Sequence, residues 1–165
     1  MKIKFAALLA AASLVLAVPV PAEASGAVWL SGHVQNTGWV DAAPSHTVQD
    51  GWTVGTTGRG LRLEALRLND PAGSVFSATA HVQDMGWIEP HADSQGRTVV
   101  GTTGRGLRLE AVALTPYAPE LRTVWCQAHV QNIGWMEPVA NGATCGTTGR
   151  GLRLEAVRIW VTDAQ

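Results

Sequence analysis

Three sets of side chains that could bind a ligand recur along the chain at equivalent positions. A Trp ring offers a large apolar face on which a sugar ring can stack. Glu can accept hydrogen bonds from hydroxyl groups, Arg can donate them from a planar fork, and His can do either. Each set contains one residue of each type: Trp39, His33, Arg62 and Glu64; Trp87, His81, Arg108 and Glu110; Trp135, His129, Arg153 and Glu155. Such sets are suited to binding a carbohydrate.

The same residues could instead serve the fold. Trp39, Trp87 and Trp135 each stand between a Gly and an apolar residue, a setting that also suits a core residue filling the gap between repeats. The His, Arg and Glu side chains could form a network that only holds each repeat together. Packing roles are expected for the tryptophans that have no counterpart in every repeat, namely Trp29, Trp52, Trp125 and Trp160. For the repeated residues, the sequence leaves both interpretations open.

Metal and catalytic sites are not favoured. A three-His zinc site would need the three His side chains on one inner layer. Strand alternation instead places His33 on the face opposite to the one that carries Leu30 and Val34. A glycosidase needs two carboxylates about 5–10 Å apart, but the repeated sets supply one Glu each. Neither a nucleophile–His–acid order nor a nucleotide-binding motif stands out. We therefore expect no enzymatic activity, no metal ion and no cofactor.

The elements that position these sets are encoded by a repeated eleven-residue motif. The sequence Gly-Thr-Thr-Gly-Arg-Gly-Leu-Arg-Leu-Glu-Ala occurs without change at Gly55–Ala65, Gly101–Ala111 and Gly146–Ala156. Its first six residues have the glycines and hydroxyls of a turn. The following Leu-Arg-Leu-Glu-Ala alternates apolar and charged residues, which predicts a half-buried strand. We expect the Arg and Glu side chains of this strand on one face and its leucines buried on the other. These leucines are Leu61, Leu63, Leu107, Leu109, Leu152 and Leu154.

A second signature, His-Val-Gln-x-x-Gly-Trp, precedes each motif and begins at His33, His81 and His129. The residues before each His alternate in polarity, and the signature therefore predicts a strand that ends in a turn. We expect this strand to pair with the strand of the motif. Together the two signatures define three repeats, covering about 28–69, 75–115 and 122–162.

Three all-β units of this size predict a pseudo-threefold domain in which each unit buries its apolar face against its neighbours. A β-trefoil has units of similar length and is the first choice. A β-prism with three sheets around an axis is the alternative. An open array of three units is less favourable because it would expose apolar sheet edges.

Residues 1–24 have the features of a signal peptide. Lys2 and Lys4 precede an apolar run, and Ala22-Glu23-Ala24 fits a small-x-small cleavage site. We expect a secreted chain in which residues 25–165 form a single domain. No later apolar stretch reaches the roughly 20 residues of a membrane span. The net charge of −1 argues against nucleic acid as a partner, because such binding depends on phosphate neutralisation.

The two cysteines of the chain, Cys126 and Cys145, are expected to form one disulfide, as is usual in an exported protein. Both replace apolar residues of the other repeats. Leu30 and Ala78 stand where the third repeat has Cys126, and Val54 and Val100 stand where it has Cys145. We therefore expect the two positions to face each other in every repeat.

The two signatures together resemble the ChW repeat, the clostridial hydrophobic repeat with a conserved tryptophan, over essentially the whole chain after residue 24. The resemblance places the conserved Trp at Trp39, Trp87 and Trp135. It implies a secreted bacterial protein with a role in binding carbohydrate, cell-surface material or another protein. The expected function is noncatalytic recognition of carbohydrate or cell-wall polysaccharide through equivalent sites in three repeats. Protein–protein interaction or surface adhesion, with a secreted protein as partner, is the alternative.

Overall fold

The computed structural model describes residues 29–42, 51–69 and 75–164, and these residues form strands and turns without a helix. The all-β prediction is confirmed. Residues 1–24, the predicted signal peptide, lie outside the described residues, as does part of the loop that follows Trp39. The described part of the chain has no helix with the length and hydropathy to span a bilayer.

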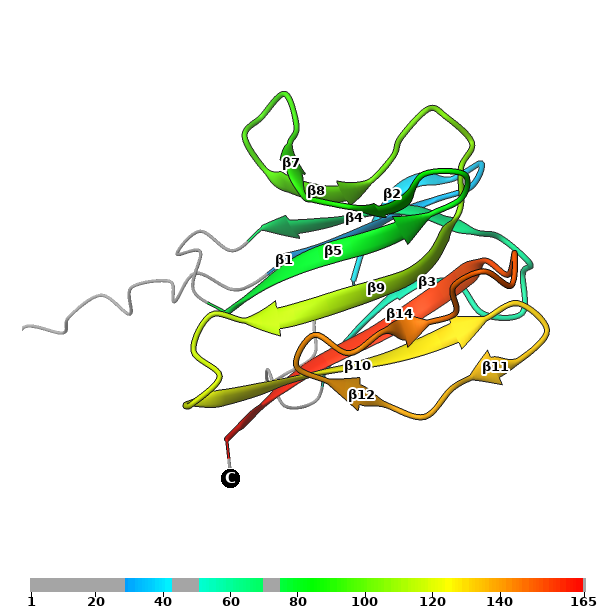
Figure 1. Cartoon of the computed structure of the whole chain (residues 1–165). Helices are drawn as coiled ribbons and strands as arrows, with labels where there is room; N and C mark the ends of the chain where they lie inside the picture. The colour runs from blue at the N-terminus through cyan, green and yellow to red at the C-terminus, as the bar shows by residue number, and fades with distance from the viewer. Residues whose placement is uncertain (1–28, 43–50, 70–74, 165) are drawn as a thin grey trace, which may run out of the picture.

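Each repeat is built on two long antiparallel strands (Figure 1). The pairs are β1 (Trp29–Val34) with β4 (Leu63–Asn69), β5 (Phe76–Val82) with β9 (Leu109–Pro116), and β10 (Arg122–Val130) with β14 (Leu154–Asp163). The first strand of each pair carries the His signature and the second carries the end of the repeated motif. The predicted pairing of these two signatures is therefore confirmed.

A short third strand folds back on the first strand of each repeat. These strands are β2 (Gly38–Asp41), β6 (Gly86–Ile88) and β11 (Gly134–Trp135). The turn that leads to them needs the left-handed backbone conformation, in which Asn36 has a φ of 59° and Gly38 a φ of 84°. Asn and Asp adopt this conformation more readily than other non-glycine residues. The resulting hairpin places the Trp of each signature directly opposite its His.

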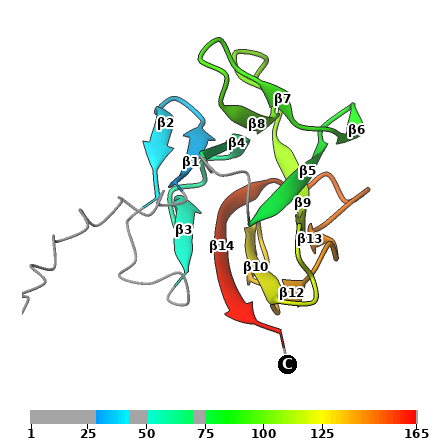
Figure 2. The ribbon, with the colours of Figure 1, turned by 90° about the vertical axis from the view of Figure 1, so that its left-hand side faces the viewer.

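The last strand before each motif pairs with a different repeat. It is β3 (Trp52–Gly55), β8 (Thr98–Gly101) or β13 (Cys145–Gly146). Strand β8 of the second repeat pairs with β4 of the first, and β13 of the third pairs with β9 of the second. Strand β3 of the first repeat closes the ring by pairing with β14 of the third, beside which it lies in Figure 2.

The described strands thus form three sheets that exchange strands in a closed cycle. Their orders are β2-β1-β4-β8, β6-β5-β9-β13 and β11-β10-β14-β3. Two further strands extend them, since β7 (His91–Ala92) pairs with β8 and β12 (Val139–Ala140) pairs with β10. The predicted threefold all-β architecture is confirmed, while its finer assignment to a trefoil or a prism stays a prediction.

The strand of each motif begins later than the alternation of Leu and charged residues suggests. Leu63, Leu109 and Leu154 start their strands and are fully buried, as predicted. The expectation of full burial is wrong for Leu61, Leu107 and Leu152, which are half-buried at the edge of the core. The reason is that the first part of the motif is a crossing from one sheet to another, with the strand beginning only after it.

A bulge at the motif Glu further interrupts the alternation. His33 pairs with Ala65 and Val34 with Leu63, which leaves Glu64 as the extra residue of β4.

The motif glycine at the end of the exchanged strand has an equally specific role. Gly101 has a φ of 110°, and a Cβ added to it would lie 2.5 Å from the backbone oxygen of Glu64. Only glycine allows the exchanged strand to approach this closely.

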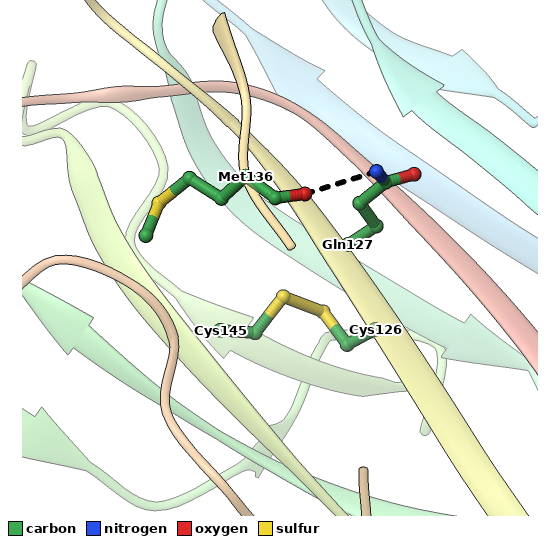
Figure 3. Close-up of a disulfide and its surroundings, with 4 residues drawn as sticks. All are labelled: Cys126, Gln127, Met136 and Cys145. Atoms are coloured by element: carbon green, nitrogen blue, oxygen red, sulfur yellow. Dashed lines mark hydrogen bonds between the residues drawn. A yellow bond between two sulfur atoms is a disulfide. The ribbon is translucent and has the colours of Figure 1, made fainter. Parts of the chain in front are cut away.

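The predicted disulfide between Cys126 and Cys145 is present, with 6.0 Å between the two Cα atoms. Figure 3 shows the bond beside Gln127, whose Nε2 donates a hydrogen bond to the backbone oxygen of Met136 at 2.9 Å. The two cysteines lie on β10 and β13, so the bond joins two different sheets. The equivalent pairs of the other repeats, Leu30 with Val54 and Ala78 with Val100, are all buried in the core.

Candidate ligand-binding sites

A compact polar cluster forms around Glu64 in the first repeat. Nδ1 of His33 lies 2.9 Å from Oε2 of Glu64, which is hydrogen-bond distance. Arg62 donates to the other carboxylate oxygen, Oε1, from Nε at 2.9 Å, and its Nη2 lies 2.7 Å from the same atom. Glu64 sits in the bulge of β4, where the extra residue allows its side chain to turn back between Arg62 and His33.

The cluster recurs in the other two repeats with the same atoms. Nη2 of Arg108 lies 2.8 Å from Oε1 of Glu110, and Nδ1 of His81 lies 3.1 Å from Oε2. In the third repeat, the corresponding distances are 2.7 Å for Arg153 and 3.3 Å for His129, both to Glu155. The structure therefore brings together all the His, Arg and Glu residues that the sequence singles out, repeat by repeat.

The geometry separates the roles of these three residue types. Each Glu is buried, and its two oxygens are engaged by Arg and His of the same repeat. A carboxylate in this position holds its neighbours in place and has little capacity left for a ligand. The His and Arg side chains keep roughly a fifth to a quarter of their surface exposed, for example 20% for His33 and 24% for Arg62. They are the members of the cluster that a ligand can reach.

Each repeated Trp lies against the His of its cluster in an edge-to-face arrangement. The ring centroids are 5.3 Å apart for His33 and Trp39, 5.6 Å for His81 and Trp87, and 5.2 Å for His129 and Trp135. Trp87 is 44% exposed and Trp135 is 40% exposed. The interpretation of the repeated tryptophans as core residues is therefore wrong for these two. Trp39 is half-buried.

The border of each site comes from the next repeat in the cycle, which the sequence does not predict. The amide of Thr102 donates to the backbone oxygen of Glu64 at 2.9 Å, and the turn that follows reaches Arg62. Equivalent bonds join Thr147 to Glu110 at 3.0 Å and Thr56 to Glu155 at 2.8 Å. Alternation along a strand shows which residues share a face, but it does not show which strand of another repeat lies beside them.

The first repeat has an additional group of charged residues beside its Trp. The guanidinium of Arg67 lies over the Trp39 ring, 3.7 Å from its centroid. Nε of Arg67 is 3.6 Å from Oδ2 of Asp93, and Arg97 holds the same oxygen at 2.8 Å. Sequence reasoning missed all three residues, although Arg67 stands between the buried Leu66 and Leu68 and so belongs to the outer face.

These contacts shift the proton affinities of the group. The hydrogen bond from the Arg97 side chain, aided by the backbone amides of Arg97 and Gln95, lowers the pKa of Asp93 from 3.8 to about 2. Burial, together with the nearby charge of Arg97, lowers the pKa of Arg67, while Asp93 and Asp41 act in the opposite direction. Asp93 is thus held in its charged form beside Arg67.

The other tryptophans divide into two kinds. Trp52 is buried in the core, as expected of a packing residue. Trp125 and Trp160 stack on each other with ring centroids 5.9 Å apart, and Nε1 of Trp125 donates to Oγ1 of Thr162 at 3.1 Å. This pair is only partly buried, on the same face of its sheet as His129. The side chain of Trp29 lies outside the described part of the structure.

The structure shows no arrangement suited to a metal ion among the residues that it describes. No three His, Cys, Asp or Glu side chains in this part of the chain come together as ligands. Each of the three repeated His residues instead contacts the Glu of its own repeat.

Comparison with known proteins agrees with the repeat structure. The family model described as "Clostridial hydrophobic W" matches residues 33–69, 81–115 and 129–163, which is more than half of the chain. Each match starts at the His of a cluster and ends within the second long strand of that repeat. Searches of curated proteins and of solved structures gave no significant match. The three matches, one to each repeat, show that this chain belongs to the clostridial hydrophobic W family.

Proposed function

We propose that this chain is a noncatalytic binding module that recognises carbohydrate, with cell-wall polysaccharide as the leading candidate. The observation that carries the proposal is the exposure of Trp87 and Trp135 beside partly exposed His and Arg side chains. An exposed indole offers an apolar face to a sugar ring, and the neighbouring donors can bind its hydroxyl groups. A site for a protein partner would more often have a broad apolar patch, whereas the exposed apolar side chain in the turn before each Trp, Met85 or Ile133, accompanies polar His and Arg side chains.

Repetition of the site would compensate for weak individual contacts. Hydroxyl groups exchange hydrogen bonds with water for hydrogen bonds with protein at little net gain in free energy. A polymer that engages two or three sites binds more tightly, because the second contact is made at a high effective concentration. The cyclic arrangement of the repeats supports this proposal, since it joins the three sites through sheets that share strands.

We also propose that the protein is exported and acts outside the cell. The predicted signal peptide and the disulfide between Cys126 and Cys145 support this location. Insoluble polymers such as peptidoglycan, cellulose and chitin would be accessible to it there.

The test is retention of the purified chain on insoluble peptidoglycan, cellulose and chitin. We expect Trp87→Ala and Trp135→Ala each to lose part of the retention, and the double variant to lose most of it. Tyr117→Ala is the matched control, because Tyr117 is an exposed aromatic residue outside the three clusters. Circular dichroism checks that each variant is folded.

Two results would contradict the proposal. If the folded double variant is retained as well as the wild type, the exposed tryptophans are not the binding surface. If the wild type binds none of the polymers but captures a secreted protein, the protein-interaction alternative is correct.

A further inference from the structure

The three tryptophan sites differ at one position of the second long strand. The residue three places after the motif Glu is Arg67 in the first repeat, Ala113 in the second and Arg158 in the third. In each repeat this residue pairs with the residue two places before the His, namely Ser31, Thr79 and Gln127. Its side chain therefore shares the outer face of the sheet with the His of the same repeat.

In the first repeat this position covers the Trp. The Arg67 guanidinium is 3.7 Å from the centroid of the Trp39 ring, the distance of direct stacking. The Arg67 side chain is only 12% exposed. Asp93, which the second repeat contributes, lies 3.6 Å from its Nε and is itself fixed by Arg97 and by two backbone amides. Arg67 thus lies over the Trp39 ring with an ion-pair partner from the second repeat beside it.

The other two sites lack this close stacking. Ala113 is too short to reach Trp87, and it carries no charge. Arg158 is exposed, lies 5.6 Å from the centroid of the Trp135 ring, and makes a long hydrogen bond of 3.5 Å to Oγ1 of Thr53. The exposed fractions agree with this difference, because Trp87 and Trp135 are exposed whereas Trp39 is half-buried.

We propose that the residue at this position decides which sites are open, so that Arg67 closes Trp39 while Trp87 and Trp135 remain free to stack with a ligand. In the closed site the planar guanidinium of Arg67 covers the face of the Trp39 ring on which a sugar would otherwise stack. The consequence for binding rests on the proposed function: only two of the three sites, those of Trp87 and Trp135, are then open to a ligand in the free protein. Closure of Trp39 is a property of the free protein.

Closure can be tested without any ligand by limited oxidation with N-bromosuccinimide, which attacks accessible indole rings. Peptide mass spectrometry then gives the rate for each Trp. In the wild type we expect Trp39 to react several-fold more slowly than Trp87 and Trp135. The buried Trp52 should stay unreactive in every variant and so reports that the fold is intact.

Three variants examine the cause of the closure. Arg67→Ala should raise the Trp39 rate to that of Trp87, and Arg67→Lys, which keeps the charge without the planar group, should give an intermediate rate. Asp93→Asn should also accelerate Trp39, because it releases Arg67 without removing it. The proposal is overturned if Trp39 of the wild type reacts as fast as Trp87, or if Arg67→Ala leaves Trp39 protected.

Retention on insoluble polysaccharide separates this inference from the proposed function. Arg67→Ala should increase retention, because it opens the Trp39 site. Trp39→Ala alone should leave retention close to that of the wild type, and in the double variant it should abolish the gain that Arg67→Ala produces. A loss as large as that of Trp87→Ala in the wild-type background would contradict the inference. If no polymer retains the wild type, the proposed function fails, and the oxidation rates still decide whether Arg67 closes Trp39.

Discussion

Glu110 shows how a buried carboxylate is accommodated at the centre of each site. Its side chain is 6% exposed, and its two oxygens lie within 2.8 Å of Arg108 and 3.1 Å of His81. A buried charge is tolerated only when it is paired and hydrogen-bonded in this way. The carboxylate in turn restrains Arg108 and also His81, whose ring lies against the exposed Trp87.

Removing this carboxylate should therefore cost stability. We expect Glu110→Ala to lower the free energy of unfolding by about 1–3 kcal/mol, because Arg108 would lose its hydrogen-bond acceptor and His81 would lose its close carboxylate contact. Urea denaturation measures the change. Glu137→Ala provides the control, since Glu137 is an exposed residue outside the clusters, and an equal effect of the two substitutions would contradict the assigned role.

Asp93 gives a prediction about pH. Its pKa is lowered from 3.8 to about 2, chiefly by the hydrogen bond from Arg97. A carboxyl group with a lowered pKa in the folded state stabilises that state above its unfolded pKa, and this stabilisation is lost as the pH falls. The contacts of Asp93 should therefore weaken between about pH 4 and pH 2. An NMR titration of the Asp93 carboxyl carbon measures this directly.

Substitution of Arg97 checks the cause of the shift. In Arg97→Gln the pKa of Asp93 should rise towards 3.8, because the principal hydrogen bond is lost. If the pKa of Asp93 stays near 2 in this variant, a group other than the Arg97 side chain is responsible for lowering it.

At the scale of the elements, the two leucines of each motif have unequal roles. Leu109 begins β9 and is fully buried, whereas Leu107 precedes the strand and is half-buried. We expect Leu109→Ala to cost about 2–5 kcal/mol through lost contacts and the cavity left behind. Leu107→Ala should cost clearly less. Urea denaturation of both variants tests the order, and equal costs would contradict the position assigned to the start of the strand.

Much of this level of structure follows from the sequence. Alternation identifies the long strand that ends in each His signature, and turn residues such as Asn36 and Gly38 identify the hairpin after it. The presence of cysteines at two apolar positions was enough to predict the disulfide. The bulge at Glu64 was not predictable, because an extra residue in a strand leaves no distinct pattern in a short run of alternating residues.

At the scale of the whole molecule, the sequence predicts three units but not how they are connected. Identical motifs in the three repeats indicate a threefold arrangement, yet they are equally consistent with each repeat keeping its own strands. Each of the strands β3, β8 and β13 instead pairs with a long strand of another repeat. That choice depends on long-range packing, for which a short strand such as Cys145–Gly146 carries too little local information.

The closed cycle predicts that the repeats cannot be separated. Deleting residues 121–165 removes both β14, the partner of β3, and β13, the partner of β9. We expect this fragment to lack a cooperative thermal transition or to assemble into oligomers through its unpaired edges. Circular dichroism and light scattering measure both properties, with residues 25–165 as the control. A stable monomeric fragment would show that the cycle is not required for folding.

Closure of the cycle also has a consequence for when the chain can fold. Gly55 pairs with Ala156, so a strand of the first repeat meets the second long strand of the third repeat. During synthesis β3 has no partner until the third repeat has been made. Pairing between such distant segments is slow, because the loss of chain entropy precedes the contacts that offset it. A delay of this kind suits a polypeptide that must be threaded unfolded through a membrane, as the proposed export would require.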